Sequence, residues 1–244
     1  MKKWIKRIII TLVSCVFILG MASCGDKTRL MISPVIQEML EREGIKNSYV
    51  SSIGDYKDVR KELSIPQVTE KEFEAYFEEE FSKYGSLSDS VVQEAFGYAS
   101  VQELKENERI SYLEHLKFME LMEARSEVMQ QLISRSSFQL DEADIANYSK
   151  RIVYREENYA SLFGYDSFEE YLSNELKCSE EEFLQKCIEE GENELKQYLV
   201  IGAIAYAEGL EVESKERVDE TFQELEGDFY NLFVPITEEF AMQR

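Results

Sequence analysis

The stretch Ser100–Arg135, SVQELKENERISYLEHLKFMELMEARSEVMQQLISR, decides the fold, and it contains neither glycine nor proline. Ser100 and Glu103 have the spacing of a capping box, in which the serine hydroxyl accepts a bond from the third helical N–H while the glutamate reaches back. A continuous helix over 101–135 would be about 50 Å long. Because this length exceeds the diameter of a small compact domain, the sequence predicts an elongated, open helical body with projecting long-helix arms.

The same start signal recurs on both sides of this stretch. Three more capping boxes are formed by Thr69 and Glu72, Ser167 and Glu170, and Ser179 and Glu182. With Asp141 and Ser214 as further N-caps and with Gly164 and Gly209 as stops, the pattern indicates an all-α chain. The predicted helices are 35–42, 70–84, 89–95, 101–135, 142–163, 168–176, 180–207 and 215–226.

Composition narrows the classes of function. The 244 residues include 27 Lys plus Arg and 49 Asp plus Glu, a formal net charge of −22. A nucleic-acid binder needs a basic surface to displace counterions from phosphates, so this balance argues against that class. It also disfavours docking of the protein surface on an anionic bilayer. A hydrophobic fraction of 44% argues against general disorder, and three prolines with 11 glycines favour helices over a turn-rich β-fold.

The N-terminus has the layout of an export signal. A basic start (residues 1–7) precedes an apolar run (8–20), and the sequence Met-Ala-Ser-Cys ends at Cys24. Small residues before a cysteine resemble a bacterial lipobox, which predicts removal of 1–23 and lipidation of Cys24 on the outer face of a cell membrane. Ordinary cleavage near Ser23 and an uncleaved anchor are the alternatives. Cys15 also fits the pattern, but its apolar run would be only about seven residues, the short limit for a signal.

This interpretation divides the chain into four parts: a signal peptide (1–23), a tether and linker (24–68), a helical domain (69–213) and a C-terminal helix and tail (214–244). No catalytic or metal motif appears in any of them. Glu180, Glu181 and Glu182 illustrate the many carboxylates, which are expected to form solvated helix faces rather than an acid/base pair. The single histidine, His115, is expected to be a boundary residue. No cofactor and no metal are expected.

Two further cysteines, Cys178 and Cys187, are expected to be free, half-buried thiols. Cys178 precedes a predicted helix and Cys187 lies two turns inside it. Eight or nine helical residues separate Cα atoms by about 12 Å, beyond the roughly 7 Å limit for a disulfide.

Apolar side chains in the predicted arms are the candidate binding residues. Phe118, Met119 and Met122 are interspersed with charges in the long helix. Such a stripe is more often core, but methionine and aromatic side chains also adapt to varied partners in a groove. Phe163 and Tyr165 lie at the next helix end, where Phe163-Gly-Tyr-Asp-Ser repeats the pattern of Phe96-Gly-Tyr-Ala-Ser. This similarity has two explanations: the same pattern of helix end and helix start arose twice independently, or the chain contains a true internal repeat.

Four segments carry a resemblance to a known family: FGYASVQEL (96–104), QLISRSSFQL (131–140), LFGYDSFEEYL (162–172) and LVIGAIAYAEGLEVE (199–213). From Thr69 to Glu213 the chain resembles the C-terminal chaperone domain of bacterial trigger factors. The last segment is the most specific, because it resembles the family's apolar helix followed by Glu-Gly-apolar-x-Val. Gly54–Lys57 and Val68–Glu70 are similar to the family's segment that leads into its isomerase domain.

The departures from the family matter equally. The ribosome-docking signature is absent, and no room exists between Lys71 and Leu87 for the isomerase domain of about 90 residues. The resemblance therefore implies an ATP-independent holdase, similar to the helical parts of the SurA and PrsA chaperones, without ribosome docking or enzymatic activity. Its expected partners are unfolded or newly exported polypeptides. The alternatives are a surface lipoprotein that scaffolds one fixed partner and, with less support, a prolyl isomerase.

Overall fold

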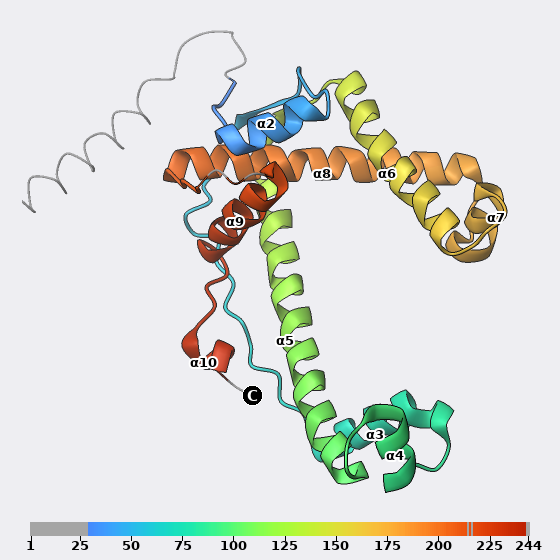
Figure 1. Ribbon diagram of the computed structural model, residues 1–244. Coiled ribbons are helices and arrows are strands. Elements are labelled where there is room, and N and C mark those ends of the chain that lie inside the picture. Colours follow the sequence, from blue (N-terminus) through green and yellow to red (C-terminus); the bar gives the residue numbers. More distant parts are fainter. Residues whose placement is uncertain (1–28, 214, 216, 243–244) are drawn as a thin grey trace, which may run out of the picture.

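The computed structural model describes residues 29–213, 215 and 217–242. It confirms the all-α fold with projecting arms, because helices dominate and the strands among these residues form one two-stranded sheet. Figure 1 shows the long helix α8 (Glu180–Glu208) crossing the molecule, with the equally prominent α5 (Val101–Ser134) descending from it. Helix α6 (Glu142–Leu162) accompanies α8 toward one end, so two arms extend from a common body.

The remaining elements are short and lie at the body or the arm tips. The body holds α2 (Pro34–Arg42), β1 (Tyr49–Ser52), β2 (Ser137–Gln139) and α9 (Val218–Asn231). The tip of the α5 arm holds α3 (Glu70–Phe81), a 3₁₀ turn (Ser82–Tyr84) and α4 (Asp89–Phe96). The tip of the α6–α8 arm holds α7 (Phe168–Tyr171) and a π-helical turn (Leu172–Leu176), and α10 (Glu238–Met242) lies near the C-terminus.

The helix starts follow the capping signals. At Thr69 and Ser179 the box is complete, with hydroxyl and glutamate bonds both present. At Ser100 the hydroxyl caps as expected, but Glu103 accepts from the amide of Ala99 at 2.7 Å, one residue before the cap. Ser167 behaves likewise, because Glu170 accepts from the amide of Asp166. All four signals therefore start a helix, although two of the boxes are shifted.

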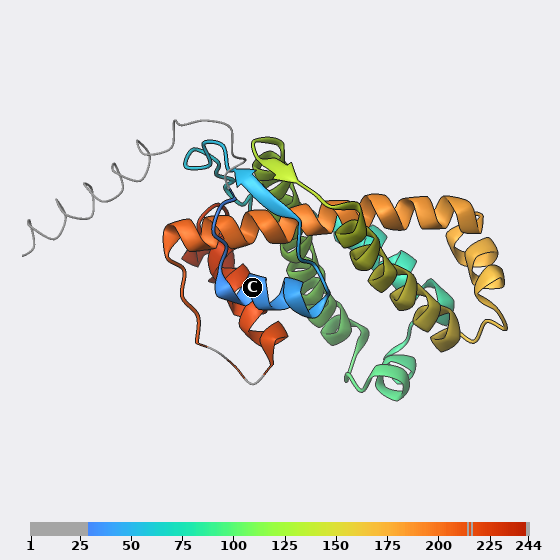
Figure 2. The same cartoon turned by 90° about the horizontal axis from the view of Figure 1, so that it is seen from above.

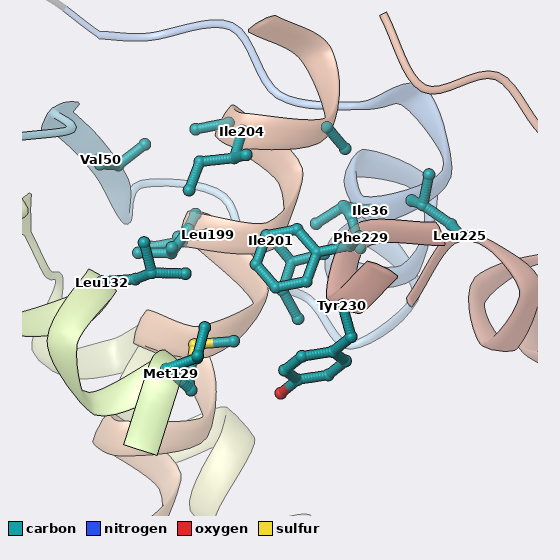
Figure 3. Packing of buried hydrophobic residues seen from close by; sticks show 14 of the residues in the cluster. Ile36, Val50, Met129, Leu132, Leu199, Ile201, Ile204, Leu225, Phe229 and Tyr230 are labelled. Carbon is teal, nitrogen blue, oxygen red and sulfur yellow. The ribbon is translucent and has the colours of Figure 1, made fainter. Parts of the chain in front are cut away.

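The body is built around the C-terminal half of α8. Figure 3 shows Ile201 of α8 near Ile36 of α2 and Phe229 of α9. Leu199 of α8 lies beside Leu132 of α5 in the same cluster. Each such side chain contributes about 1.5–3 kcal/mol through burial. Seen from above, the two strands lie on one side of α8, and helices α2 and α9 lie on the opposite side (Figure 2). Residues far apart in the sequence thus share one core.

The expected tether and linker requires a correction from Ser33 onward. Ile36, Val50 and Val59 are buried in the body core, and β1 pairs with β2 in antiparallel register. The carboxylate of Asp144 accepts hydrogen bonds from three successive backbone amides of this segment, at 2.6–3.0 Å. The prediction failed because polar residues and turn signals between short apolar positions look like a linker until distant helices cover them.

Each arm tip carries a small core of its own. Phe73, Phe77 and Phe81 of α3 pack with Val92 and Leu104 at the α5 tip. The tip of the α6–α8 arm has a second cluster: Ile152, Ala160, Tyr171, Leu172, Phe183 and Cys187. The chain therefore has three hydrophobic clusters among its described residues, one in the body and one at each arm tip.

The last predicted helix, 215–226, was misplaced. Helix α9 spans Val218–Asn231, and its N-cap Arg217 makes no side-chain capping bond. The amide of Lys215 instead donates to the hydroxyl of Thr221 at 2.9 Å, which holds the preceding turn outside the helix. The helix continues past 226 because Phe229 and Tyr230 are buried in the body. The proposed cap Ser214 lies outside the described residues.

Candidate interaction surface between two helical arms

The middle of α5 is the least covered part of the long helices. Between Leu104, which belongs to the tip core, and Ala124, which belongs to the body core, α5 has no buried residue. Phe118, Met119 and Met122 are 57%, 51% and 44% exposed. The reading that these three are core residues is therefore wrong, and the stretch presents apolar side chains to solvent.

Phe118 and Met122 face away from the chain that runs beside the arm. On the other side of α5, the amide of Ser64 donates to Glu120 at 2.9 Å and Lys61 pairs with Glu127. Phe118 and Met122 are each two residues from Glu120, which places them about 200° around the helix from it. In Figure 1 the chain leading to α3 follows one side of α5, and the α6–α8 arm projects on the other. Phe118 and Met122 thus lie on the face of α5 opposite this chain.

The second arm contributes a matching pair, Leu184 and Ile188 of α8. Both are 44% exposed. They precede the buried Leu195 and Leu199 at spacings of four, seven and four residues, so all four lie on one face of α8. At the inner end of this face, Leu199 lies beside Leu132 of α5 (Figure 3). The exposed pair therefore continues the face with which α8 meets α5, on the inner side of the corner.

Sequence reasoning missed Leu184 and Ile188, although a signal existed. Together with Leu195 and Leu199 they form one apolar stripe along the helix. The stripe is longer than the part of the helix that the body core covers. On α5 the same relation holds for Phe118, Met122 and the buried Met129, at spacings of four and seven. Both long helices therefore extend an apolar face out of the body core. We call the exposed part of these faces, together with Met119 that flanks Met122 on α5, the inner surface: Phe118, Met119, Met122, Leu184 and Ile188.

Phe163 and Tyr165, the two remaining candidates, lie at the tip of the α6–α8 arm and differ from each other. Phe163 is 70% exposed, and its neighbour Leu162 is exposed as well. Tyr165 is half-buried against the tip core and donates a hydrogen bond to the Glu175 carboxylate. This bond, which favours the protonated hydroxyl, raises the pKa of Tyr165 to about 12. Tyr165 therefore has a structural role at the tip, whereas Phe163 is free for contact.

The electrostatic environment of the arms is acidic. Much of the positive charge is paired, as in Lys105 with Glu74, Arg155 with Glu190 and Lys61 with Glu127, at 2.5–3.0 Å. Such exposed pairs contribute little stability, but they leave the excess of carboxylates to set the potential around the arms. An apolar surface framed in this way favours segments that carry positive charge.

The described residues can be compared with the side-chain clusters that bind metals and with the requirements of a membrane span. Within the described ranges, no three His, Cys, Asp or Glu side chains converge as metal ligands. Cys178 and Cys187 are free, as expected, but only Cys178 is half-buried, whereas Cys187 is buried. Burial raises the pKa of the Cys187 thiol to about 11, so this thiol stays protonated at neutral pH. Among the described helices, none combines the length and the apolarity that a membrane span requires.

A comparison with protein families gives a match over residues 100–232 to the bacterial trigger factor protein C-terminus. This span covers more than half of the chain, including α5, both arms' long helices and α9. The chain belongs to the trigger factor C-terminal family. Neither the curated proteins nor the solved structures gave a match.

Membership indicates the type of module to which the long helices belong. The trigger factor C-terminal domain is a chaperone-type module that binds polypeptides rather than a catalytic one. Open apolar faces on two arms suit that role, because patches of this kind on a soluble protein mark interaction sites.

Proposed function

We propose that this protein is an extracytoplasmic, ATP-independent holdase that binds unfolded or newly exported polypeptides between its arms. The observation that carries the proposal is the continuation of two core faces, on α5 and α8, into exposed stripes on the inner side of one corner. The contact residues are those of the inner surface, with Phe163 at the arm tip as an outer contact. Tyr165 contributes by stabilising that tip.

The expected binding is weak and reversible. Burying two or three client side chains at about 1.5–3 kcal/mol each gives about 3–9 kcal/mol before costs. The entropy lost on association and ordering offsets several kcal/mol of this burial free energy, which leaves micromolar or weaker affinity. Release then needs no nucleotide. The acidic surroundings favour client segments with Lys or Arg near their apolar residues and keep the loaded complex soluble.

The location is part of the same proposal. The basic, apolar and small-residue order of residues 1–24 supports export and lipid attachment at Cys24, which lies outside the described residues. Globomycin sensitivity and a mass shift that Cys24→Ala abolishes are the expected results. A secreted, soluble wild-type protein that begins at residue 25 or later would contradict lipidation without affecting the binding proposal.

Client binding is tested with the full-length protein in detergent and a permanently unfolded probe, carboxymethylated α-lactalbumin. Phe118→Ala with Leu184→Ala is expected to weaken binding by about ten-fold, because both arms lose a contact. Met31→Ala is the matched control, since Met31 is exposed on the N-terminal segment and away from the arms. Equal loss in both variants would contradict the assigned surface.

The probe also separates the alternatives. A scaffold for a fixed partner would not distinguish the unfolded probe from native α-lactalbumin, whereas a holdase binds only the unfolded form. A prolyl isomerase would accelerate the cis/trans equilibration of a proline peptide. No acceleration is expected, since the family domain matched by this chain is a chaperone module.

A further inference from the structure

The inner surface contains two methionines with exposed side chains. Met119 and Met122 lie one turn apart on α5, beside Phe118, and are about half exposed. Met129 lies further along the same helix and is only 4% exposed, in the body core. A thioether differs from the carbon side chains around it because two-electron oxidants attack its sulfur. One helix thus presents two oxidisable sulfurs and shields a third.

We propose that Met119 and Met122 form an oxidation-sensitive modification site, at which peroxide converts both thioethers to sulfoxides and thereby weakens client binding. The inference rests on the proposed function, since it assigns regulation to the same surface. It requires no change in the fold, because the two side chains stand outside the core clusters.

The chemistry is a two-electron oxygen transfer from hydrogen peroxide. The methionine sulfur attacks one peroxide oxygen, an S–O bond forms and the O–O bond breaks. The departing hydroxide takes up the proton from the transferred oxygen and leaves as water. Sulfur is oxidised by two electrons and peroxide is reduced, and methionine sulfoxide reductases reverse the change.

The consequence follows from polarity. A sulfoxide is polar and strongly hydrated, so a client side chain that packs on it must displace water from the new S–O group. Met119 and Met122 supply two of the three exposed apolar side chains at this point of α5, and their neighbour Phe118 alone offers a smaller contact. Among the described residues, the two cysteines do not compete strongly for peroxide, because Cys187 is buried and Cys178 is half-buried.

The experiment treats the full-length protein with hydrogen peroxide, removes the peroxide with catalase and measures binding of labelled carboxymethylated α-lactalbumin. Peptide mapping should show sulfoxide at Met119 and Met122 well before Met129. The affinity should fall about ten-fold, with the thermal midpoint unchanged. Treatment with both epimer-specific sulfoxide reductases should restore it.

Two variants make the result specific. Met119→Leu with Met122→Leu keeps apolar volume and lacks the sulfurs, so it should bind before and after peroxide with the same affinity. Met31→Leu removes an exposed methionine outside the inner surface and should remain peroxide-sensitive. Equal sensitivity of the double leucine variant, or unchanged affinity of the wild type after sulfoxide formation, overturns the inference. Failure of the proposed function can be told apart from failure of this inference. If the proposed function is wrong, the wild-type protein does not bind the probe even before peroxide is added.

Discussion

Two segments with nearly the same sequence differ in how far their first residue, a phenylalanine, is buried. Phe96-Gly-Tyr-Ala-Ser and Phe163-Gly-Tyr-Asp-Ser each end one helix and start the next, with Gly97 and Gly164 at φ of 81° and 79°. Both glycines are left-handed, although Gly97 is the C-cap of its helix whereas Gly164 follows the C-cap Phe163. The leading phenylalanines differ, because Phe96 packs on Phe81 and Tyr84 at 5.4 Å and 4.9 Å between ring centres, whereas Phe163 is 70% exposed.

The difference lies in what the rest of the chain supplies. At the α5 tip, α3 and the following 3₁₀ turn bring aromatic rings over Phe96. At the other tip, α7 turns back onto α8, and the ring in contact with Phe163 comes from Tyr159 on its own helix, at 6.3 Å. Local sequence therefore fixes a turn, while burial of the same side chain depends on distant neighbours.

The largest expected effect is the one that separates the two phenylalanines. Phe96→Ala should cost about 2–4 kcal/mol of local stability at the α5 tip, because it leaves a cavity among aromatic rings. Phe163→Ala should change stability by less than about 0.5 kcal/mol, as an exposed substitution does. Hydrogen exchange of α3 and α4, read against that of α7, measures both. Similar costs at the two sites would show that burial does not distinguish them.

A second prediction applies the same contrast between buried and exposed side chains to the inner surface. Met119→Ala with Met122→Ala should weaken binding of an unfolded client about ten-fold, equivalent to about 1.4 kcal/mol. Each substitution should leave the free energy of unfolding within about 0.5 kcal/mol, since neither side chain is in a core. Met129→Ala is the buried counterpart and should cost about 2–5 kcal/mol. If the double variant unfolds as readily as Met129→Ala, the contrast fails.

A third prediction tests the shared backbone. Gly97→Ala and Gly164→Ala should each cost about 1 kcal/mol, because both positions are left-handed and no atom lies within 4 Å of an added Cβ. The cost should be nearly equal at the two sites, in contrast to the phenylalanine pair. Denaturant unfolding combined with local hydrogen exchange checks this. A clearly larger cost at one site would mean that tertiary contacts also constrain its turn.

The smallest effect concerns Tyr165. Its folded-state pKa of about 12 exceeds the ordinary value of 10.0, so its bond to Glu175 stabilises the fold below pH 10 and is lost as the pH rises toward 12. Tyr165→Phe should therefore melt slightly earlier than wild type at pH 8, and the difference should narrow between pH 10 and pH 12. Client affinity should not change. If this variant lost client binding at an unchanged melting temperature, Tyr165 would be a client-contact residue rather than a structural one.

The sequence by itself determined the local structure of the helical regions. Ser179 with Glu182 starts α8 and Gly209 ends it, because capping bonds and left-handed conformations depend on residues a few positions apart. The absence of glycine and proline from 101–134 likewise made α5 long enough to project as an arm. The family relationship was also readable, since it resides in these same local patterns. Even where Glu103 and Glu170 bonded one residue early, the helix began where the signal stood.

Only the tertiary structure decided which apolar residues are core and which are surface. Met122 and Met129 occupy the same face of α5, and Ile188 and Leu195 the same face of α8, yet one of each pair is open and the other buried. The segment from Ser33 to Val59 joined the body because α8 and α9 cover it, which no local pattern announced. Burial is set by contacts between residues far apart in the chain, so it becomes visible only when the helices are placed against one another.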